Sequence, residues 1–401
     1  MQLKKELKKE INNLLTLYPE PDNYSLLQIR LSGPIWKDNE VANNCLSIIS
    51  KIKEYDVFNA HMQCVGNMAS QVTYEYFLNW LLNRSRYTGL EKAFKEVDNY
   101  LSASNVELEL VEVISGASSK HTYNFYNGCK FIGVNTIFNI ENILSNVDFR
   151  KNLIDIAMSG FGTHALSGVI STKYFQKIKE YKTSDSNSIP DYKNEIPYQT
   201  LIDLRFCLSL SIKPENGIFS GGTTIVAPDS IPIINSGKSW SLSTPKQSNF
   251  GCEISLDEFK MADDLLMKLQ AMTPKFKNKL MIPLDRLNNV GSRESLVDRA
   301  IELRICLESI FLNDGNKEQL RFRLSLRAAL FLGDSLEERK RIFRIIKKAY
   351  DITSTAVHSG KVSNKAKEEK DLLMAIDLAK SALIKLIKIG EVNWENLELK
   401  F

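Results

Sequence analysis

The last third of the chain carries an almost continuous helical pattern. Apolar residues recur at helical spacing from Lys275 to the C-terminus, and glycines at 291, 315, 333 and 360 interrupt the pattern. The predicted helices lie near 276–290, 294–312, 318–332, 336–357 and 366–389. Short connections between long amphipathic helices predict an antiparallel bundle.

The first part of the chain predicts a different structure. Residues 24–31 and 106–114 have strand patterns, whereas 68–83 and 88–101 have helical periodicity. Thr88 followed by Glu91 predicts a capping box at the start of the second helix. The dipeptide Asn127-Gly128 predicts a hairpin with a type I′ turn.

Together these patterns predict an α+β chain with three parts. We expect a mixed α/β domain over 1–195, a connector packed on the bundle over 196–274, and a helical domain over 275–401. The connector begins with a helix over 198–211, continues through a turn-rich stretch around Gly221, and ends with a helix capped by Ser255. A Ser, Asp and Asn-rich segment at 182–193 predicts a linker.

Charge and cysteine usage limit the class of protein. The net charge is +4, and all of this surplus lies downstream of Met281. Six cysteines are scattered without a CxxC pair, so we expect buried thiols in a reducing cytoplasm, with no metal and no organic cofactor. No apolar run is long enough to span a membrane, which predicts a soluble cytoplasmic protein without a membrane partner.

The segment Tyr350–Gly360, with the sequence YDITSTAVHSG, follows a basic helical stretch. Upstream, Asp298, Leu307-Glu308-Ser309 and Leu326-Arg327-Ala328 lie on the preceding predicted helices. This arrangement resembles the ApeA-like branch of the HEPN superfamily. In that branch an acidic residue, a LES-L helix and an R-A-LL helix precede a Y-x-x-R-S-x-x-V-H-x-G segment. The resemblance is specific over about residues 275 to 401 and weaker over about 198 to 275.

The resemblance implies a nuclease signature, in which four to six residues separate an arginine from a histidine. His358 matches the histidine, but Thr353 stands where the arginine is expected. A histidine that titrates near neutral pH suits the role of the base that deprotonates a ribose 2′-hydroxyl. We expect Thr353 and Ser354 to face the same groove and to donate hydrogen bonds to phosphate. The alternative is a histidine kept for packing or for capping the helix.

Basic residues precede and follow this segment. Arg341, Arg344 and Lys348 recur at helical spacing, and Lys361 follows the histidine by three residues. Their predicted role is to contact RNA phosphates. The alternative interpretation is a solvated basic face.

Other polar residues of this region have predicted structural roles. Arg327 lies within an apolar helix, where a charge needs a partner, and Asp298, Glu302 and Glu308 are the candidates. Tyr350 is predicted to belong to the core.

The resemblance implies a homodimer through the C-terminal bundle, in which two histidine segments face each other. We therefore expect an RNA-directed protein, a metal-independent endoribonuclease of bacterial defence or toxin type. The alternatives are a catalytically degenerate HEPN module that binds RNA or scaffolds a partner complex, and a purely structural dimerisation protein. The N-terminal domain is of unknown role and is a candidate site for a protein partner.

Overall fold

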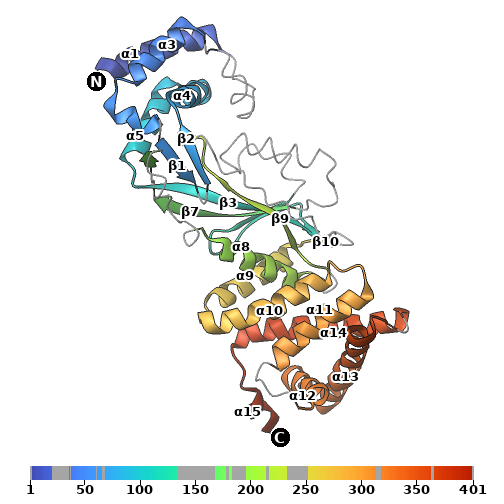
Figure 1. The fold of residues 1–401 in the computed structure, drawn as a ribbon. Helices are drawn as coiled ribbons and strands as arrows, with labels where there is room; N and C mark the ends of the chain where they lie inside the picture. Colours follow the sequence, from blue (N-terminus) through green and yellow to red (C-terminus); the bar gives the residue numbers. More distant parts are fainter. Residues whose placement is uncertain are drawn as a thin grey trace.

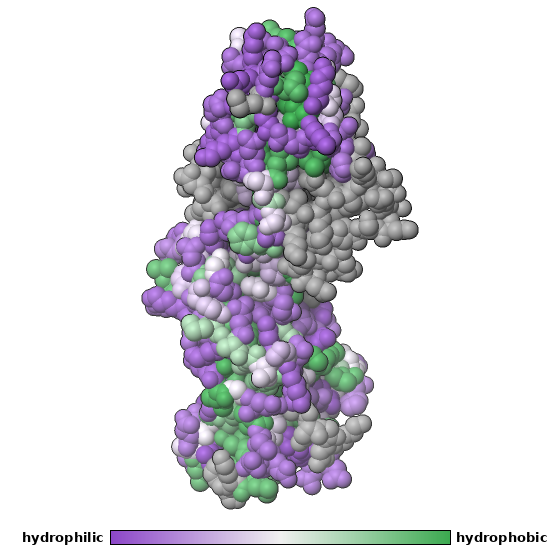
Figure 2. Space-filling model, turned by 90° about the vertical axis from the view of Figure 1, so that its left-hand side faces the viewer, coloured by the Kyte–Doolittle hydropathy of each residue, from purple (hydrophilic) through white to green (hydrophobic). Residues whose placement is uncertain are grey.

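The computed structural model shows an α+β chain that runs from N-terminal helices through β-sheets to a helical bundle (Figure 1). It describes residues 2–19, 36, 38–59, 61–65, 68–133, 168–177, 180–182, 196–213, 216–232, 252–312, 318–362 and 365–399. The segments 24–31 and 183–193, predicted as a strand and as most of a linker, lie outside these residues. One side of the molecule is mainly hydrophilic, with hydrophobic residues scattered over it (Figure 2).

Helices make up most of the N-terminal end. They are α1 (Gln2–Leu17), α3 (Glu40–Ile49), the 3₁₀ helix η1 (Lys53–Phe58), α4 (Tyr74–Thr88) and α5 (Leu90–Ser102). The helix α1 buries Leu7, Ile11 and Leu14, which recur at helical spacing and pack against α3. The rings of Phe58 and Phe77 stack with their centroids 4.0 Å apart, so η1 is joined to α4 through the core.

Two local predictions for this part are wrong. Residues 68–72 form a strand, and α4 begins only after Thr73, whose hydroxyl caps it by accepting from the Tyr76 amide. The Thr88 hydroxyl still belongs to the last turn of α4 and donates to the Arg84 carbonyl at 2.9 Å. Gly89 is therefore the N-cap of α5, because its φ of 87° lets the chain turn between the two helices.

The strands within the described residues form three sheets. A five-stranded antiparallel sheet has the order β5 (Thr122–Asn124), β6 (Lys130–Gly133), β7 (Gly168–Lys177), β3 (Asn105–Ser115) and β9 (Phe219–Val226). A three-stranded sheet has the order β2 (Met68–Val72), β1 (His61–Val65) and β8 (Glu180–Lys182). The short strands β10 (Cys252–Glu253) and β4 (Ala117–Ser118) pair in parallel.

The structure confirms the strand predicted over 106–114, which lies within β3, and the hairpin, which joins β5 to β6. The predicted type I′ turn is wrong. The Gly128 amide donates to the Phe125 carbonyl at 3.0 Å, and Gly128 alone takes the left-handed conformation, with a φ of 81°. This is the three-residue loop of a type I turn followed by a glycine. The glycine-rich stretch predicted to be turns also forms a strand, β9, whose Gly221 and Gly222 lie beside β3.

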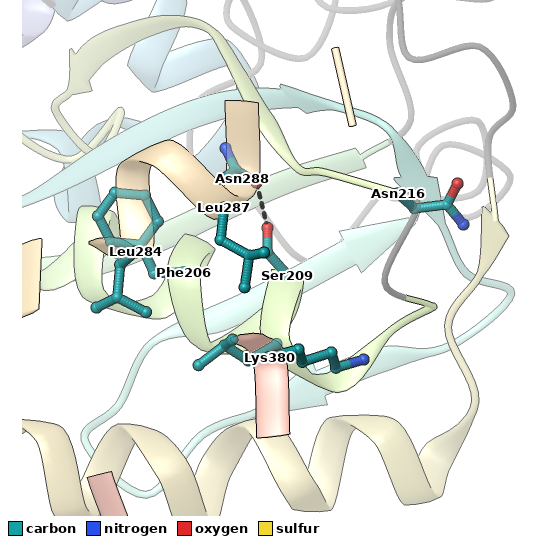
Figure 3. A pocket seen from close by; sticks show the side chains of 8 residues that line it. Phe206, Ser209, Asn216, Leu284, Leu287, Asn288 and Lys380 are labelled. Atoms are coloured by element: carbon teal, nitrogen blue, oxygen red, sulfur yellow. Dashed lines mark hydrogen bonds between the residues drawn. The ribbon is translucent and has the colours of Figure 1, made fainter. Parts of the chain in front are cut away.

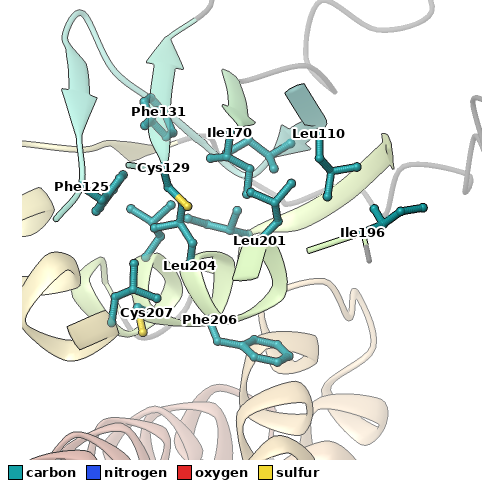
Figure 4. Close-up of a cluster of buried hydrophobic side chains, with 14 of the residues drawn as sticks. Leu110, Phe125, Cys129, Phe131, Ile170, Ile196, Leu201, Leu204, Phe206 and Cys207 are labelled. Atoms are coloured by element: carbon teal, nitrogen blue, oxygen red, sulfur yellow. The ribbon is translucent and has the colours of Figure 1, made fainter. Parts of the chain in front are cut away.

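The helix α8 (Tyr198–Ser211) lies between the five-stranded sheet and the bundle. Leu201 and Leu204 point toward the sheet residues Leu110 and Ile170, whereas Phe206 points toward the helices below (Figure 4). A helix buried on both sides must be apolar around most of its circumference. This position explains why α8 lacks a polar face.

The C-terminal part is helical. Its helices are α9 (Leu256–Gln270), α10 (Pro274–Val290), α11 (Leu296–Phe311), α12 (Leu320–Leu332), α13 (Leu336–Ser359), α14 (Lys365–Ile389) and α15 (Trp394–Leu399). The five helices predicted from periodicity are confirmed, with bounds shifted by at most two residues. Ser255 forms the predicted capping box with Glu258. The α12 and α13 pair lies at the end of the molecule opposite α1 (Figure 1).

Candidate functional site

The helix α13 presents His358 in its last turn. Ser335 caps its start by accepting from the Glu338 amide at 3.2 Å, and Gly360 ends it in the left-handed conformation with a φ of 65°. His358 is exposed, and its ring forms no hydrogen bond to any other residue that the structure describes. The histidine is accessible to a ligand.

Thr353 does not share the surface of His358. Its exposed fraction is 0%, and its hydroxyl donates to the Tyr350 carbonyl at 3.0 Å. The expectation that Thr353 faces an open groove is therefore not met in this chain. The cause is helical geometry, because five residues at 3.6 residues per turn place two side chains about 140° apart. Ser354, half-buried and one turn before His358, lies on the same side as the histidine.

Five side chains of α13 form a surface that we call the His358 stripe. Helical geometry places them within about 60° of one another around the axis. They are Lys340, Phe343, Lys347, Ser354 and His358, each exposed or half-buried. Lys340, Phe343 and Lys347 were not predicted from the sequence. The signal that was available is the seven-residue spacing of Lys340, Lys347 and Ser354, which returns to one helix face every two turns.

The four predicted phosphate contacts lie in different places. Arg344 is exposed at the edge of the stripe, and Lys361 is exposed just beyond Gly360. Arg341 and Lys348 are exposed but lie about 80 to 100° around the helix from His358. Lys348 also pairs with Asp371 of α14, with 2.5 Å between the ammonium and the carboxylate.

Tyr350 packs at the interface of α11 and α13. The Arg304 guanidinium lies 4.9 Å from its ring centroid and donates to its hydroxyl at 3.2 Å. Arg304 also donates to the Glu308 carboxylate at 2.9 Å. Burial raises the pKa of the Tyr350 hydroxyl above its ordinary value. These contacts join α11 to α13 beneath the stripe.

The predicted partners of Arg327 are wrong. Arg327 is buried and donates to the Glu398 carboxylate and to the Phe311 carbonyl, each at 2.6 Å. Glu398 belongs to α15, so this contact ties the C-terminal helix to the bundle. Glu302 is buried against Arg286 and Arg293, Glu308 pairs with Arg304, and Asp298 is exposed.

A small pocket lies at the junction of the sheet and the bundle (Figure 3). Its lining includes Ser209, Asn216, Asn288 and Lys380. The Ser209 hydroxyl donates to the side-chain oxygen Oδ1 of Asn288 at 2.5 Å. The free volume of about 10 Å³ has room for about one water molecule. The pocket is therefore part of a structural junction, too small for a substrate.

Within the described residues, no three metal-ligating side chains gather at one place. In the same part of the chain, no helix combines the length and the apolar character needed to cross a membrane. Comparisons with family models, with curated proteins and with solved structures gave no match. The geometry of α13 and its neighbours is therefore what supports a function.

Proposed function

We propose that this chain is a HEPN-type, RNA-directed protein of the cytoplasm that cleaves RNA at His358 without a metal, in the manner of a defence or toxin endoribonuclease. The observation that supports this proposal is an accessible histidine on a helix face that also carries Lys340, Lys347 and, at its edge, Arg344. Cations along one face attract the phosphate backbone and hold it beside the histidine.

The chemistry follows from the imidazole. Neutral His358 accepts the proton of a ribose 2′-hydroxyl, and the 2′ oxygen attacks the adjacent phosphorus. The bond from phosphorus to the 5′ oxygen breaks, and that oxygen takes up a proton from water or from the imidazolium. The products are a 2′,3′-cyclic phosphate and a 5′-hydroxyl. Ser354 lies close enough along the helix to donate a hydrogen bond to the phosphate, and Lys361 is the nearest cation in sequence.

A homodimer completes this proposal. One chain supplies one histidine and no signature arginine, so a second copy facing it through the bundle would add a second imidazole and further cations to one groove. Light scattering on the full chain should give twice the monomer mass of 45.6 kDa. A monomer at high micromolar concentration would reject the shared groove.

The second candidate is a degenerate HEPN module that binds RNA or scaffolds a cleaving partner, with the N-terminal part as the place for protein contact. The burial of Thr353 favours this candidate, because the position of the missing arginine contributes no group to the surface of the chain. Removing one transition-state charge contact commonly costs a factor of roughly 100 to 1000 in rate.

A cleavage assay with chelator present separates the two candidates. We expect slow cleavage by the wild type and none by His358→Ala. His121→Ala is the matched control, because His121 is also exposed but lies in the N-terminal part. RNA binding without cleavage by all three proteins would support the binding module. Cleavage unaffected by His358→Ala would move the active site elsewhere.

A further inference from the structure

An aromatic pair with one exposed and one half-buried ring lies where α12 meets the His358 stripe. Phe322 of α12 is 50% exposed, and its ring meets that of Phe343 edge to face, with 5.8 Å between centroids and an interplanar angle of 70°. Single exposed apolar side chains are ordinary. Phe322 is distinctive because the ring of Phe343 fixes the orientation of its side chain and because cations lie beside the pair.

The charges beside the pair favour an anionic ligand. The Lys347 ammonium lies 5.8 Å from the Phe343 ring centroid, and Arg344 is exposed on the next residue along the helix. Neither cation has a carboxylate partner among the residues that the structure describes. Asp351, the acidic residue that follows on α13, is neutralised by Arg321 at 2.8 Å.

An acidic residue in the first turn of α13 is also paired. Glu337 accepts from the Lys340 ammonium at 2.8 Å. The surface around Phe322 therefore keeps a net positive charge. Such a surface complements a negatively charged phosphate backbone better than an uncharged apolar partner. Aromatic rings beside cations are the usual platform for unpaired bases, because every base has a π-face that stacks on an aromatic ring.

From this arrangement we propose that Phe322 and Phe343 form a stacking platform for an unpaired base, with Lys347 and Arg344 holding the neighbouring phosphates. The inference rests on the proposed function and adds that the RNA is single-stranded. A paired base has its faces covered by its neighbours in the duplex and cannot stack on this pair. The strand would then run along α13 to His358, which lies about 22 Å beyond Phe343 along the helix by its rise.

The test measures the affinity of the full chain for a fluorescent single-stranded RNA and for the same strand annealed to its complement. Phe322→Ala should weaken single-strand binding by roughly 5- to 150-fold and leave duplex binding unchanged. Phe175→Ala is the matched control, because Phe175 of β7 is 69% exposed and lies on the sheet. It should bind both RNAs like the wild type.

Two further measurements separate the outcomes. Phe322→Ala should keep the wild-type salt dependence, because stacking releases no counterion. Its melting temperature and its sedimentation should also stay unchanged. If the wild type binds single-stranded RNA and Phe322→Ala binds it with the same affinity, the platform is overturned while the proposed function stands. If Phe322→Ala changes the oligomeric state, the pair belongs to a protein interface and the platform is overturned. Absence of all RNA binding by the wild type overturns both proposals.

Discussion

The side chain of Asn288 and the backbone of Ile218 exchange two hydrogen bonds. The Ile218 amide donates to Asn288 Oδ1 at 2.9 Å, and Asn288 Nδ2 donates back to the Ile218 carbonyl at 2.9 Å. Asn288 lies on α10 and Ile218 directly precedes β9, so this pair joins the bundle to the sheet. Gly217 permits the close approach, because a Cβ there would lie 2.5 Å from the backbone carbonyl oxygen of Asn288.

Replacing Asn288 should destabilise the whole chain. Asn288→Ala removes the partner of the buried Ile218 carbonyl and leaves the Ile218 amide only the Ser209 hydroxyl, at 3.0 Å, as an acceptor. The expected cost is about 1 to 3 kcal/mol in the free energy of unfolding. Urea denaturation measures this cost. Asn44→Ala is the control, since Asn44 is exposed on α3 and should change stability little. Equal midpoints for the two variants would show that the junction is not a stabilising contact.

The sequence predicted the bundle better than the sheet, for a physical reason. Helical periodicity and capping are local, so the helices from 276 onward and the Ser255 cap follow from neighbouring residues. The strand β9 does not follow from neighbouring residues, because Gly221 and Gly222 predict turns. These residues form a strand because they pair with β3, about a hundred residues earlier in the chain. The pairing of Arg327 with Glu398 likewise depends on where α15 packs.

The candidate site was predictable only in part. Motif spacing identified His358 as the candidate base, but it could not tell that His358 is exposed and that Thr353 points into the bundle. Nor could it tell whether the face that Lys347 shares with His358 is turned to solvent or to the bundle. That distinction depends on the rotation of α13 against α11, α12 and α14, which is set by packing.

Placing arginine at position 353 tests the burial of this residue. Spacing alone predicts that Thr353→Arg restores the signature and raises cleavage, whereas the structure predicts destabilisation by about 3 kcal/mol or more, because an unpaired guanidinium would enter the core. Thr355→Arg, on the exposed face, is the control and should be tolerated. Thermal denaturation distinguishes them. A stable Thr353→Arg dimer with faster cleavage would show that the position opens in the assembly.

Glu109 should make stability depend on pH. Its carboxyl is buried, and burial raises its pKa above the ordinary value. The Ser171 hydroxyl, which donates to the carboxylate at 2.6 Å, and the nearby Lys130 and Lys173 lower the pKa, but burial is the larger effect. A raised pKa in the folded state means that the folded chain holds the proton more tightly than the unfolded chain. The stabilisation is therefore complete below the ordinary pKa of 4.5 and is lost as the pH rises through the folded pKa.

The variant Glu109→Gln isolates this contribution, because it keeps the shape of the side chain and removes the titration. Urea denaturation between about pH 4 and pH 7 should show the wild type losing stability relative to Glu109→Gln as the pH rises. Glu107→Gln serves as the comparison, since Glu107 is half-buried on the same strand and pairs with Lys173 at 2.5 Å. Parallel curves for wild type and Glu109→Gln would contradict the prediction.

The last prediction compares two adjacent lysines. Lys347 lies on the His358 stripe without a carboxylate partner among the described residues, whereas Lys348 lies on the flank and pairs with Asp371. If RNA follows the stripe, Lys347→Ala removes a phosphate contact and lowers the slope of log affinity against log salt by about 0.7, the value for one contact on a single strand. Lys348→Ala should change the slope less, because its charge is already neutralised. Binding measured over a range of salt concentrations gives both slopes. A larger effect of Lys348→Ala would place the RNA on the α14 side of the helix and would remove the stripe as its path.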